Sequence, residues 1–344
     1  GLCLGREGPS IQFGAMAAKG AAKMTKAYKT TELRMISCGA GAGMAAAFNS
    51  PLAGIMFVLE EIHHTFDKAI LCMGIVATIT ADFVSKLFFG QGTVFHYNTE
   101  NLPLRYYWLL VLFGILLGMC GSLYNIVMVK GQDLYKKITK IPAWLKLALV
   151  FAASGVAGLL LPQVLCGGHS MVDFLIQEHP SVSLMLCLLT AKFFFGAFSF
   201  SSGAPGGTLY PLTVLGTYIG AVFGEAAMNV FHLKGDLREE FIVLGMAGLF
   251  ASIVRAPITG VIVVFEITGN MKSLLPLVAV SLVSYATANM LGSKPFYSSL
   301  LSRILKNSED VPQGTGEKVL RTLVVPMGSW LHGKRISDVE WGRH

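Results

Sequence analysis

The sequence has 344 residues, of which 53% are hydrophobic and only 14% are Asp, Glu, Lys or Arg. Soluble chains usually carry about 25% charged residues, so this composition argues against two or three soluble domains. The formal net charge is +7, but no long basic stretch is interleaved with aromatic residues, and we therefore expect no nucleic-acid partner. Few charges and 38 glycines are typical of helices packed closely in lipid. We expect an all-α integral membrane protein.

Five stretches free of Asp, Glu, Lys and Arg are near or above the ~20 residues that a spanning helix needs. They are Ile36–Leu59, Tyr106–Val129, Leu147–Val172, Phe193–Gly224 and Ser273–Ser293. The first contains several glycines and Pro51, and the fourth contains the run 201–207, which is rich in Ser, Gly and Pro. Interrupted helices expose backbone groups that lipid cannot satisfy, so they are tolerated where they line a polar cavity. The pattern predicts a bundle of broken helices around a transport site.

The two halves of the chain carry the same landmarks in the same order. One set recurs at an offset of 202 residues: Gly5, Pro9 and Gly14 with Gly207, Pro211 and Gly216. A second set recurs at an offset of 206: Gly39, Ala45, Pro51, Gly54 and Glu60 with Gly245, Ala251, Pro257, Gly260 and Glu266. This indicates a pseudo-twofold inverted repeat with the site at the interface of the halves. The second half begins near Tyr106, so we expect roughly one hundred residues of the domain to precede Gly1.

The C-terminal end has a different composition. Lys306–Gln313 is polar, and Lys318–His344 mixes charged residues with short apolar runs. We expect residues 1–305 to form the transmembrane domain, and residues 306–344 to be a linker and the truncated start of a soluble α/β regulatory domain.

The segment Gly5-Arg6-Glu7-Gly8-Pro9 predicts the start of a helix whose amides face a ligand. Proline suits the first helical turn, and the glycines leave the backbone N–H groups accessible. Helix N-termini attract anions, and Gly207–Pro211 repeats the arrangement, so two facing N-termini would form an anion site. Glu7 is a carboxylate where an anion belongs, which suggests that it occupies the site when ionised and leaves it when protonated. The alternative is an ordinary helix-start glutamate at the membrane interface.

Two adjacent carboxylates follow the apolar run that ends at Leu59. Glu60 has Glu266 as its repeat partner, which favours a structural or capping role in both halves. Glu61 corresponds to Ile267, and an acid present in one half only is a candidate for proton entry. The alternative is a pair of exposed carboxylates at a helix end.

The sequence contains no pattern that predicts a metal site or an enzyme. The six cysteines are scattered without a C-x-x-C pair, which excludes a zinc ribbon and indicates no disulfide framework. Glu60, Glu61, His63 and His64 form two overlapping Glu-x-x-His pairs, but a di-iron site needs another such pair on a second helix, and the sequence has none. We expect no metal, no cofactor and no enzyme.

Four motifs occur in a fixed order across about residues 1–305: Gly5-Arg-Glu-Gly-Pro9, the run Phe48–Glu61, Ser202-Gly-Ala-Pro-Gly-Gly207 and Lys294-Pro-Phe-Tyr297. Together they resemble the CLC family of chloride channels and proton/chloride antiporters. The resemblance implies a homodimer in the cell membrane, multi-pass and in contact with lipid, with one anion path per subunit and a cytoplasmic tail. The serine-bearing segment that completes the family's filter would precede Gly1.

The resemblance also implies roles for single residues. Glu7 would be the gating glutamate, Glu61 the inner proton-transfer glutamate, and Tyr297 the tyrosine whose hydroxyl contacts the central anion. Further anion-binding positions would be Gly5, Arg6, Gly8, Gly207, Thr208 and Leu209, the last two through their backbone amides. The family usually shows Gly-x-Phe-x-Pro where this chain has Gly207-Thr208-Leu209-Tyr210-Pro211, a change that backbone coordination tolerates.

These features favour a proton-coupled chloride antiporter, with chloride and protons as the transported ions. The alternative is a voltage- or pH-gated chloride channel of the same fold, which would not need Glu61. A fluoride exporter is disfavoured by Tyr297 and by the Gly5–Pro9 sequence. The tail segment Leu323–Val339 resembles the start of the C-terminal subdomain of potassium-transport regulatory (RCK) proteins, which implies a small ligand there.

Overall fold

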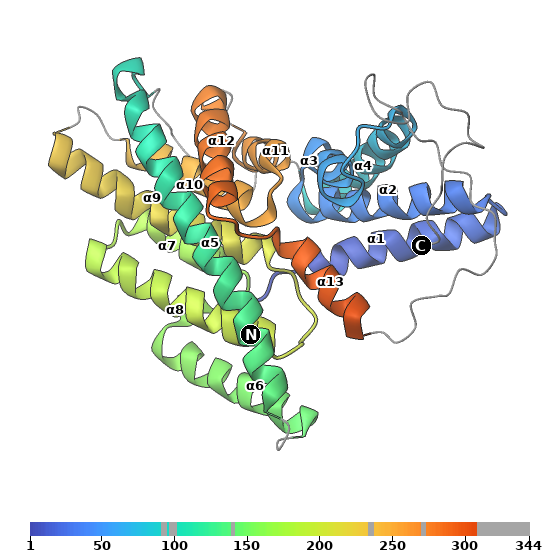
Figure 1. Cartoon of the computed structure of the whole chain (residues 1–344), viewed down its shortest axis with the longest axis horizontal. Coiled ribbons are helices and arrows are strands. Elements are labelled where there is room, and N and C mark those ends of the chain that lie inside the picture. The colour runs from blue at the N-terminus through green and yellow to red at the C-terminus, as the bar shows by residue number, and fades with distance from the viewer. Residues whose placement is uncertain (91–94, 96–101, 139–141, 233–236, 270–272, 308–344) are drawn as a thin grey trace, which may run out of the picture.

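The computed structural model describes residues 1–90, 95, 102–138, 142–232, 237–269 and 273–307 (Figure 1). The elements in these ranges are helices, and the one extended pairing within them is an isolated bridge between Gly5 and Gly207. The expectation of an all-α protein is therefore confirmed for this part of the chain. The tail expected to start a regulatory domain falls on residues 308–344, outside the described ranges.

Two sets of four helices repeat one another. The first set is α1 (Glu7–Met24), α2 (Lys29–Phe48), α3 (Pro51–Phe57), which continues into the π-helical turn η1 (Val58–Ile62), and α4 (Lys68–Phe89). The second set is α9 (Leu209–Phe231), α10 (Arg238–Val254), α11 (Pro257–Thr268) and α12 (Leu274–Met290). In each set the second helix packs against the other three, and the short helices α3 and α11 meet between the sets. This is the inverted repeat that the two offsets predict.

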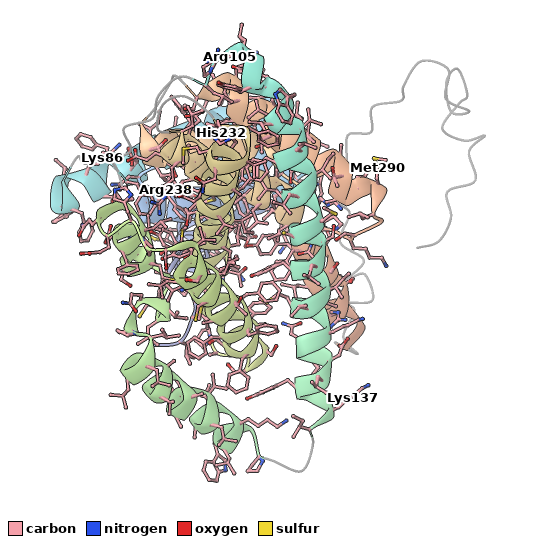
Figure 2. The ribbon with its side chains drawn as sticks, turned by 90° about the vertical axis from the view of Figure 1, so that its left-hand side faces the viewer. Lys86, Arg105, Lys137, His232, Arg238 and Met290 are labelled. Carbon is pink, nitrogen blue, oxygen red and sulfur yellow. The ribbon has the colours of Figure 1, made fainter. Side chains whose placement is uncertain are left out.

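The remaining helices connect the two sets or follow them. They are η2 (Leu104–Tyr106), α5 (Tyr107–Lys137), α6 (Ala143–Leu160), η3 (Pro162–Val164), α7 (His169–Gln177), α8 (Val182–Ser201) and α13 (Phe296–Asn307). The 31-residue α5 runs the height of the molecule, with Arg105 near one end and Lys137 at the other (Figure 2). At the usual rise per residue it is about 46 Å long, which exceeds the ~30 Å hydrocarbon core of a bilayer.

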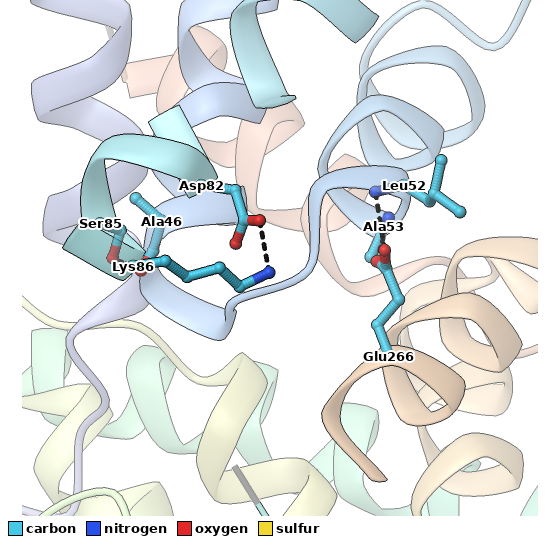
Figure 3. A network of polar contacts seen from close by, with 7 residues as sticks. All are labelled: Ala46, Leu52, Ala53, Asp82, Ser85, Lys86 and Glu266. Atoms are coloured by element: carbon cyan, nitrogen blue, oxygen red, sulfur yellow. Dashed lines mark hydrogen bonds and ion pairs between the residues drawn. The ribbon is translucent and has the colours of Figure 1, made fainter. Parts of the chain in front are cut away.

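Among the described residues, four helical segments are long and apolar enough to cross a membrane: Lys68–Phe89, Leu104–Lys137, Val182–Ser201 and Leu209–Phe231. The first of these, α4, is absent from the five charge-free stretches because it contains Asp82 and Lys86. These side chains lie one helical turn apart, and the Lys86 Nζ atom is 2.6 Å from Asp82 Oδ2 (Figure 3). The pair neutralises both charges, which lowers their cost in lipid.

The breaks predicted from Gly and Pro are present and have the same geometry in both halves. The α2 helix ends at Phe48, its C-cap residue Asn49 has a left-handed φ of 53°, and α3 begins at Pro51. The α10 helix ends at Val254, its C-cap residue Arg255 has a φ of 74°, and α11 begins at Pro257. A left-handed residue ends a helix, and the proline starts the next because it needs no amide donor there.

Close helix contacts explain two glycine pairs of the repeat. A Cβ atom at Gly14 on α1 would collide with the carbonyl oxygen of Gly39 on α2, and the reverse also holds. Gly216 on α9 and Gly245 on α10 show the same mutual approach. Only a residue without a side chain lets these backbones touch, so these landmarks fix the packing inside each half.

One side-chain hydrogen bond occurs at equivalent positions in both halves but between different residue types. Arg34 near the start of α2 donates to Asp67, the N-cap residue of α4, over 3.1 Å. At the corresponding positions, Ser273 at the start of α12 donates to Glu240 on α10 over 2.6 Å. The two halves therefore have a hydrogen bond at the same pair of positions, although the residue types differ.

The two halves differ in what covers them. In the second half α5 packs on α10 and α12. The equivalent face of α1, α2 and α4 carries an apolar groove of about 1530 Å³.

Candidate functional site

The helices α1 and α9 begin at one point and run away from it in opposite directions (Figure 1). Gly5 and Gly207 join their starts by exchanging two backbone hydrogen bonds of 2.8 Å each. The free first-turn amides of two helices therefore gather in one small region. Such amides carry partial positive charge and form a ready anion site.

The Glu7 carboxylate lies in this region. Its Oε1 atom accepts a hydrogen bond of 2.9 Å from the Tyr210 amide, and the amides of Leu209 and of Glu7 itself also face the carboxylate. The side chain is 1% exposed. Glu7 is therefore not an exposed carboxylate at an interface: it occupies the amide-lined position where an anion would bind.

Three predicted glycines make room for this carboxylate. A Cβ atom at Gly207 would lie 2.6 Å from Glu7 Oε1, and one at Gly5 would overlap the same carboxylate. A Cβ at Gly8 would approach the Gly207 backbone to 3.0 Å. The glycines are thus required because the carboxylate and the two helix starts share one space.

Tyr297 joins the site from the first turn of α13. The side chain of Thr208, at the N-cap of α9, is its hydrogen-bond partner, and Tyr297 lies within electrostatic range of both Glu7 and Glu61. Thr208 and Leu209 are both buried. The structure therefore brings residues that were predicted from the two halves together, and Tyr297 is within electrostatic range of both candidate carboxylates.

The turn that precedes Tyr297 is held by two side chains that sequence reasoning did not single out. The Asn125 amide on α5 donates to the carbonyl oxygens of Ile253 and Lys294, each over 3.2 Å. The Arg255 guanidinium donates to the Ser293 carbonyl over 2.7 Å. A turn tied at successive residues fixes where the Tyr297 ring enters the site.

Glu60 and Glu61 follow one another in the π-helical turn η1, and turns of this kind are frequent at functional sites. The Glu60 carboxylate accepts from the Thr259 amide and the Thr259 hydroxyl, both over 2.7 Å, and so it caps α11. Glu61 is half-buried and acts electrostatically on Tyr297. The two adjacent carboxylates therefore have different surroundings, and the one without a repeat partner is within electrostatic range of the candidate site.

The adjacent His64 is engaged locally. Its Nδ1 atom lies 2.8 Å from the carbonyl oxygen of Glu60. Within the described ranges no three His, Cys, Asp or Glu side chains are grouped so that they could hold a metal ion.

Arg6 points away from the amides. Its Nη2 atom donates to the Ala47 carbonyl over 3.2 Å, and the side chain is exposed. It lines a cavity of about 220 Å³ beside Glu7, together with Leu4, Gly5, Ala47, Phe48, Cys166, Gly167, His169 and Tyr210. His169 and the Tyr210 side chain were missed by the sequence analysis, because no motif connects residues from separate helices.

The fold and the site define a class of protein: an integral membrane protein with an inverted repeat, in which the first-turn amides of two helices meet at one buried point. Residues 1–289 match the family model described as voltage gated chloride channel. The H(+)/Cl(-) exchange transporter ClcA of Klebsiella pneumoniae subsp. pneumoniae is 34% identical over 320 residues, covering 90% of this chain and 67% of the relative. The same transporter of Citrobacter koseri is 33% identical over the same shares.

Solved structures agree with these relatives. A slow cyanobacterial Cl-/H+ antiporter superposes with a TM-score of 0.85 at 27% identity, covering 90% of this chain and 73% of that chain. A CLC-type fluoride/proton antiporter shares the fold, with a TM-score of 0.72 at 23% identity over 87% of this chain and 73% of that one. The chain belongs to the voltage gated chloride channel, or CLC, family.

Proposed function

We propose that this chain is a proton-coupled chloride antiporter. The observation that carries the proposal is the Glu7 carboxylate, which lies in the amide site at the meeting point of α1 and α9. A group that binds both a proton and the anion site links the two ions. The relatives named as exchange transporters and the antiporter structure at 27% identity support the same function.

The coupling follows from competition for one set of amides. Ionised Glu7 supplies the negative charge that the amides of Leu209 and Tyr210 stabilise. When Glu7 takes up a proton it loses that charge and the attraction to the helix N-termini, and chloride can take its place. When chloride leaves, Glu7 releases its proton and returns. Each cycle then moves chloride in exchange for a proton.

Two further residues complete the path. The Tyr297 hydroxyl, next to Thr208, offers a donor to chloride beyond the Glu7 position. Glu61 supplies protons from the opposite side, because it is the second carboxylate near Tyr297 and has no capping partner like that of Glu60. Chloride and protons would share the Glu7 end of the path and separate beyond Tyr297.

The transport domain comprises residues 1–305 in this proposal and works in the cell membrane as a homodimer with a cytoplasmic tail. Membrane-spanning helices and the family support the membrane location. The mass of the detergent-solubilised protein, measured by light scattering, tests the dimer: a monomer would contradict it.

The same fold could instead form a chloride channel, and one measurement separates the two. With equal chloride on both sides of a planar bilayer, a pH gradient shifts the reversal potential of an antiporter because protons contribute to the coupled current. We expect such a shift. A reversal potential that stays at zero would assign the protein as a channel.

A further inference from the structure

The 220 Å³ cavity beside Glu7 contains two side chains that the proposed transport cycle does not use. They are His169, the first residue of α7, and Tyr210, in the first turn of α9. His169 is exposed, whereas Glu7 is 1% exposed, and both line the cavity. The cavity therefore connects the buried carboxylate with a residue in contact with solvent.

His169 is fixed next to the anion site through Tyr210. The His169 Nδ1 atom lies 2.7 Å from the Tyr210 hydroxyl oxygen, and the two ring centroids are 4.3 Å apart. The backbone amide of the same tyrosine donates to Glu7 over 2.9 Å. Tyr210 is itself 6% exposed and stacked on Phe48. One residue thus connects the anion site to an ionisable ring at the cavity.

We propose that this cavity receives chloride on the Glu7 side and that His169 sets its charge. Protonated His169, close to the Arg6 guanidinium, attracts chloride into the cavity, and neutral His169 attracts it less. The inference rests on the proposed chloride transport. A cleft with one sign of charge concentrates the opposite ion, and that sets how fast the site is filled.

The groups around His169 allow this charge to change within the working range of pH. The titratable and charged side chains that face it from the neighbouring elements are Arg6, Glu7, Cys166, Asp173, Lys192 and Tyr210. Desolvation and the Arg6 guanidinium lower the pKa of His169, and the Asp173 carboxylate raises it. Since the ordinary imidazole pKa is about 6.5, the positive charge develops as the pH falls below that value.

Protonation adds charge without releasing Tyr210. Neutral His169 with its proton on Nε2 accepts the tyrosine O–H at Nδ1, and the other neutral tautomer and the protonated ring donate Nδ1–H to the tyrosine oxygen. The ring pair therefore stays in place in both states. The expected change is electrostatic rather than a movement of the cavity wall.

Chloride flux in a Glu7→Gln background tests the proposal, because this change removes the carboxylate that lines the cavity together with His169. Purified protein is reconstituted in liposomes, and initial chloride efflux is measured between about pH 7.5 and pH 5, where ordinary Asp and Cys side chains do not titrate. We expect Glu7→Gln flux to rise severalfold as the pH falls. The rise should shrink at high salt, because exposed charges are screened.

Two matched variants assign the response. Glu7→Gln/His169→Gln keeps a hydrogen-bonding partner for Tyr210 but cannot be charged, so its flux should be low and independent of pH. Glu7→Gln/His169→Lys carries a permanent charge, so its flux should be high and independent of pH. If the glutamine variant elutes as folded protein and keeps the full pH response, or if Glu7→Gln shows none, the proposal is wrong.

Coupling is measured separately on the protein with Glu7 intact. Proton uptake during chloride efflux measures coupling, and this measurement is independent of the comparison among the His169 variants. A channel with a pH-dependent Glu7→Gln flux would leave the His169 proposal standing while removing the antiporter. Coupled transport by the protein with Glu7 intact, together with a Glu7→Gln flux that does not change with pH, would support the antiporter and contradict the His169 proposal.

Discussion

Glu60 and Glu266 each cap the helix to which the other belongs. Glu60, at the end of α3 and η1, accepts from the amides of Ile258 and Thr259 in the first turn of α11. Glu266, near the end of α11, accepts from the amides of Leu52 and Ala53 in the first turn of α3 over 3.0 and 2.8 Å (Figure 3). Each carboxylate faces the positive end of a helix. The exchange fastens the two halves at the contact between their short helices.

This exchange predicts a loss of stability when either carboxylate is neutralised. Hydrogen bonds to a charged group contribute about 1.5–3 kcal/mol, so Glu60→Gln and Glu266→Gln should each lower the unfolding midpoint in detergent. Glu60→Gln should cost more because Glu60 also accepts from the Thr259 hydroxyl. Glu178→Gln, at an exposed position after α7, is the control. Equal midpoints for all three variants would contradict the exchange.

The ion pair inside α4 predicts an asymmetry between single and double substitutions. The Asp82 side chain is 8% exposed and the Lys86 side chain 32%. Lys86→Leu leaves a buried carboxylate without its cation and should cost about 2 kcal/mol, at the low end for such pairs because Lys86 is partly exposed. Asp82→Leu/Lys86→Leu removes both charges and should be closer to the original protein in thermal unfolding. A double variant less stable than Lys86→Leu would contradict this expectation, because removal of an unpaired buried carboxylate should restore stability.

The sequence indicates the repeat and much of the anion site because both depend on local backbone requirements. Gly5 and Gly207 must lack side chains, and Pro51 and Pro257 must start helices, so their spacing is visible along the chain. Glu60 and Glu266 both cap a short helix, and their equivalent positions in the repeat predict a shared role without knowledge of their contacts.

Other features depend on contacts between distant segments and leave no local pattern. The search for charge-free stretches misses α4 because it contains Asp82 and Lys86, and the sequence does not show that these two charges are paired. The contact between His169 and Tyr210 joins residues 41 positions apart, and each residue alone resembles an ordinary aromatic side chain in a membrane protein. The π-helical turn that contains Glu60 and Glu61 likewise has no signal in the sequence analysis.

Glu7→Gln should keep chloride flux and abolish the proton movement coupled to it. Glutamine fills nearly the same volume but cannot be ionised, so it cannot exchange a proton or compete with chloride as an anion. Chloride efflux and external pH are followed together in liposomes, with Glu178→Gln as the control. Proton pumping by Glu7→Gln against a chloride gradient would remove Glu7 from the gate.

Tyr297 should contribute to anion affinity through its hydroxyl. Tyr297→Phe keeps the aromatic ring and removes the donor, whereas Tyr297→Ala removes both. We expect chloride binding measured by calorimetry to weaken in both variants, about tenfold or less for the loss of one hydrogen bond. The ring also packs against Phe296, so a purely structural anchor would lower stability in Tyr297→Ala and leave chloride affinity unchanged in Tyr297→Phe.

Glu61 separates the antiporter from the channel. An ionisable carboxylate in an apolar membrane helix costs roughly 2.5–3.5 kcal/mol on insertion scales, so it needs a charged partner, a water path or a function. Glu60 caps α11, whereas Glu61 acts electrostatically on Tyr297. We therefore expect Glu61→Gln to keep chloride flux and lose proton flux. Glu60→Gln, its immediate neighbour, should lower stability or rate while proton coupling persists.

The comparison requires both ions to be measured in one preparation. The original protein, Glu61→Gln and Glu60→Gln are reconstituted at equal density, and chloride efflux and proton uptake are recorded together after a chloride gradient is imposed. Loss of coupling in Glu60→Gln alone would exchange the roles of the two carboxylates. Chloride flux without proton movement in the original protein would leave Glu61 without a transport role and assign the fold to a channel.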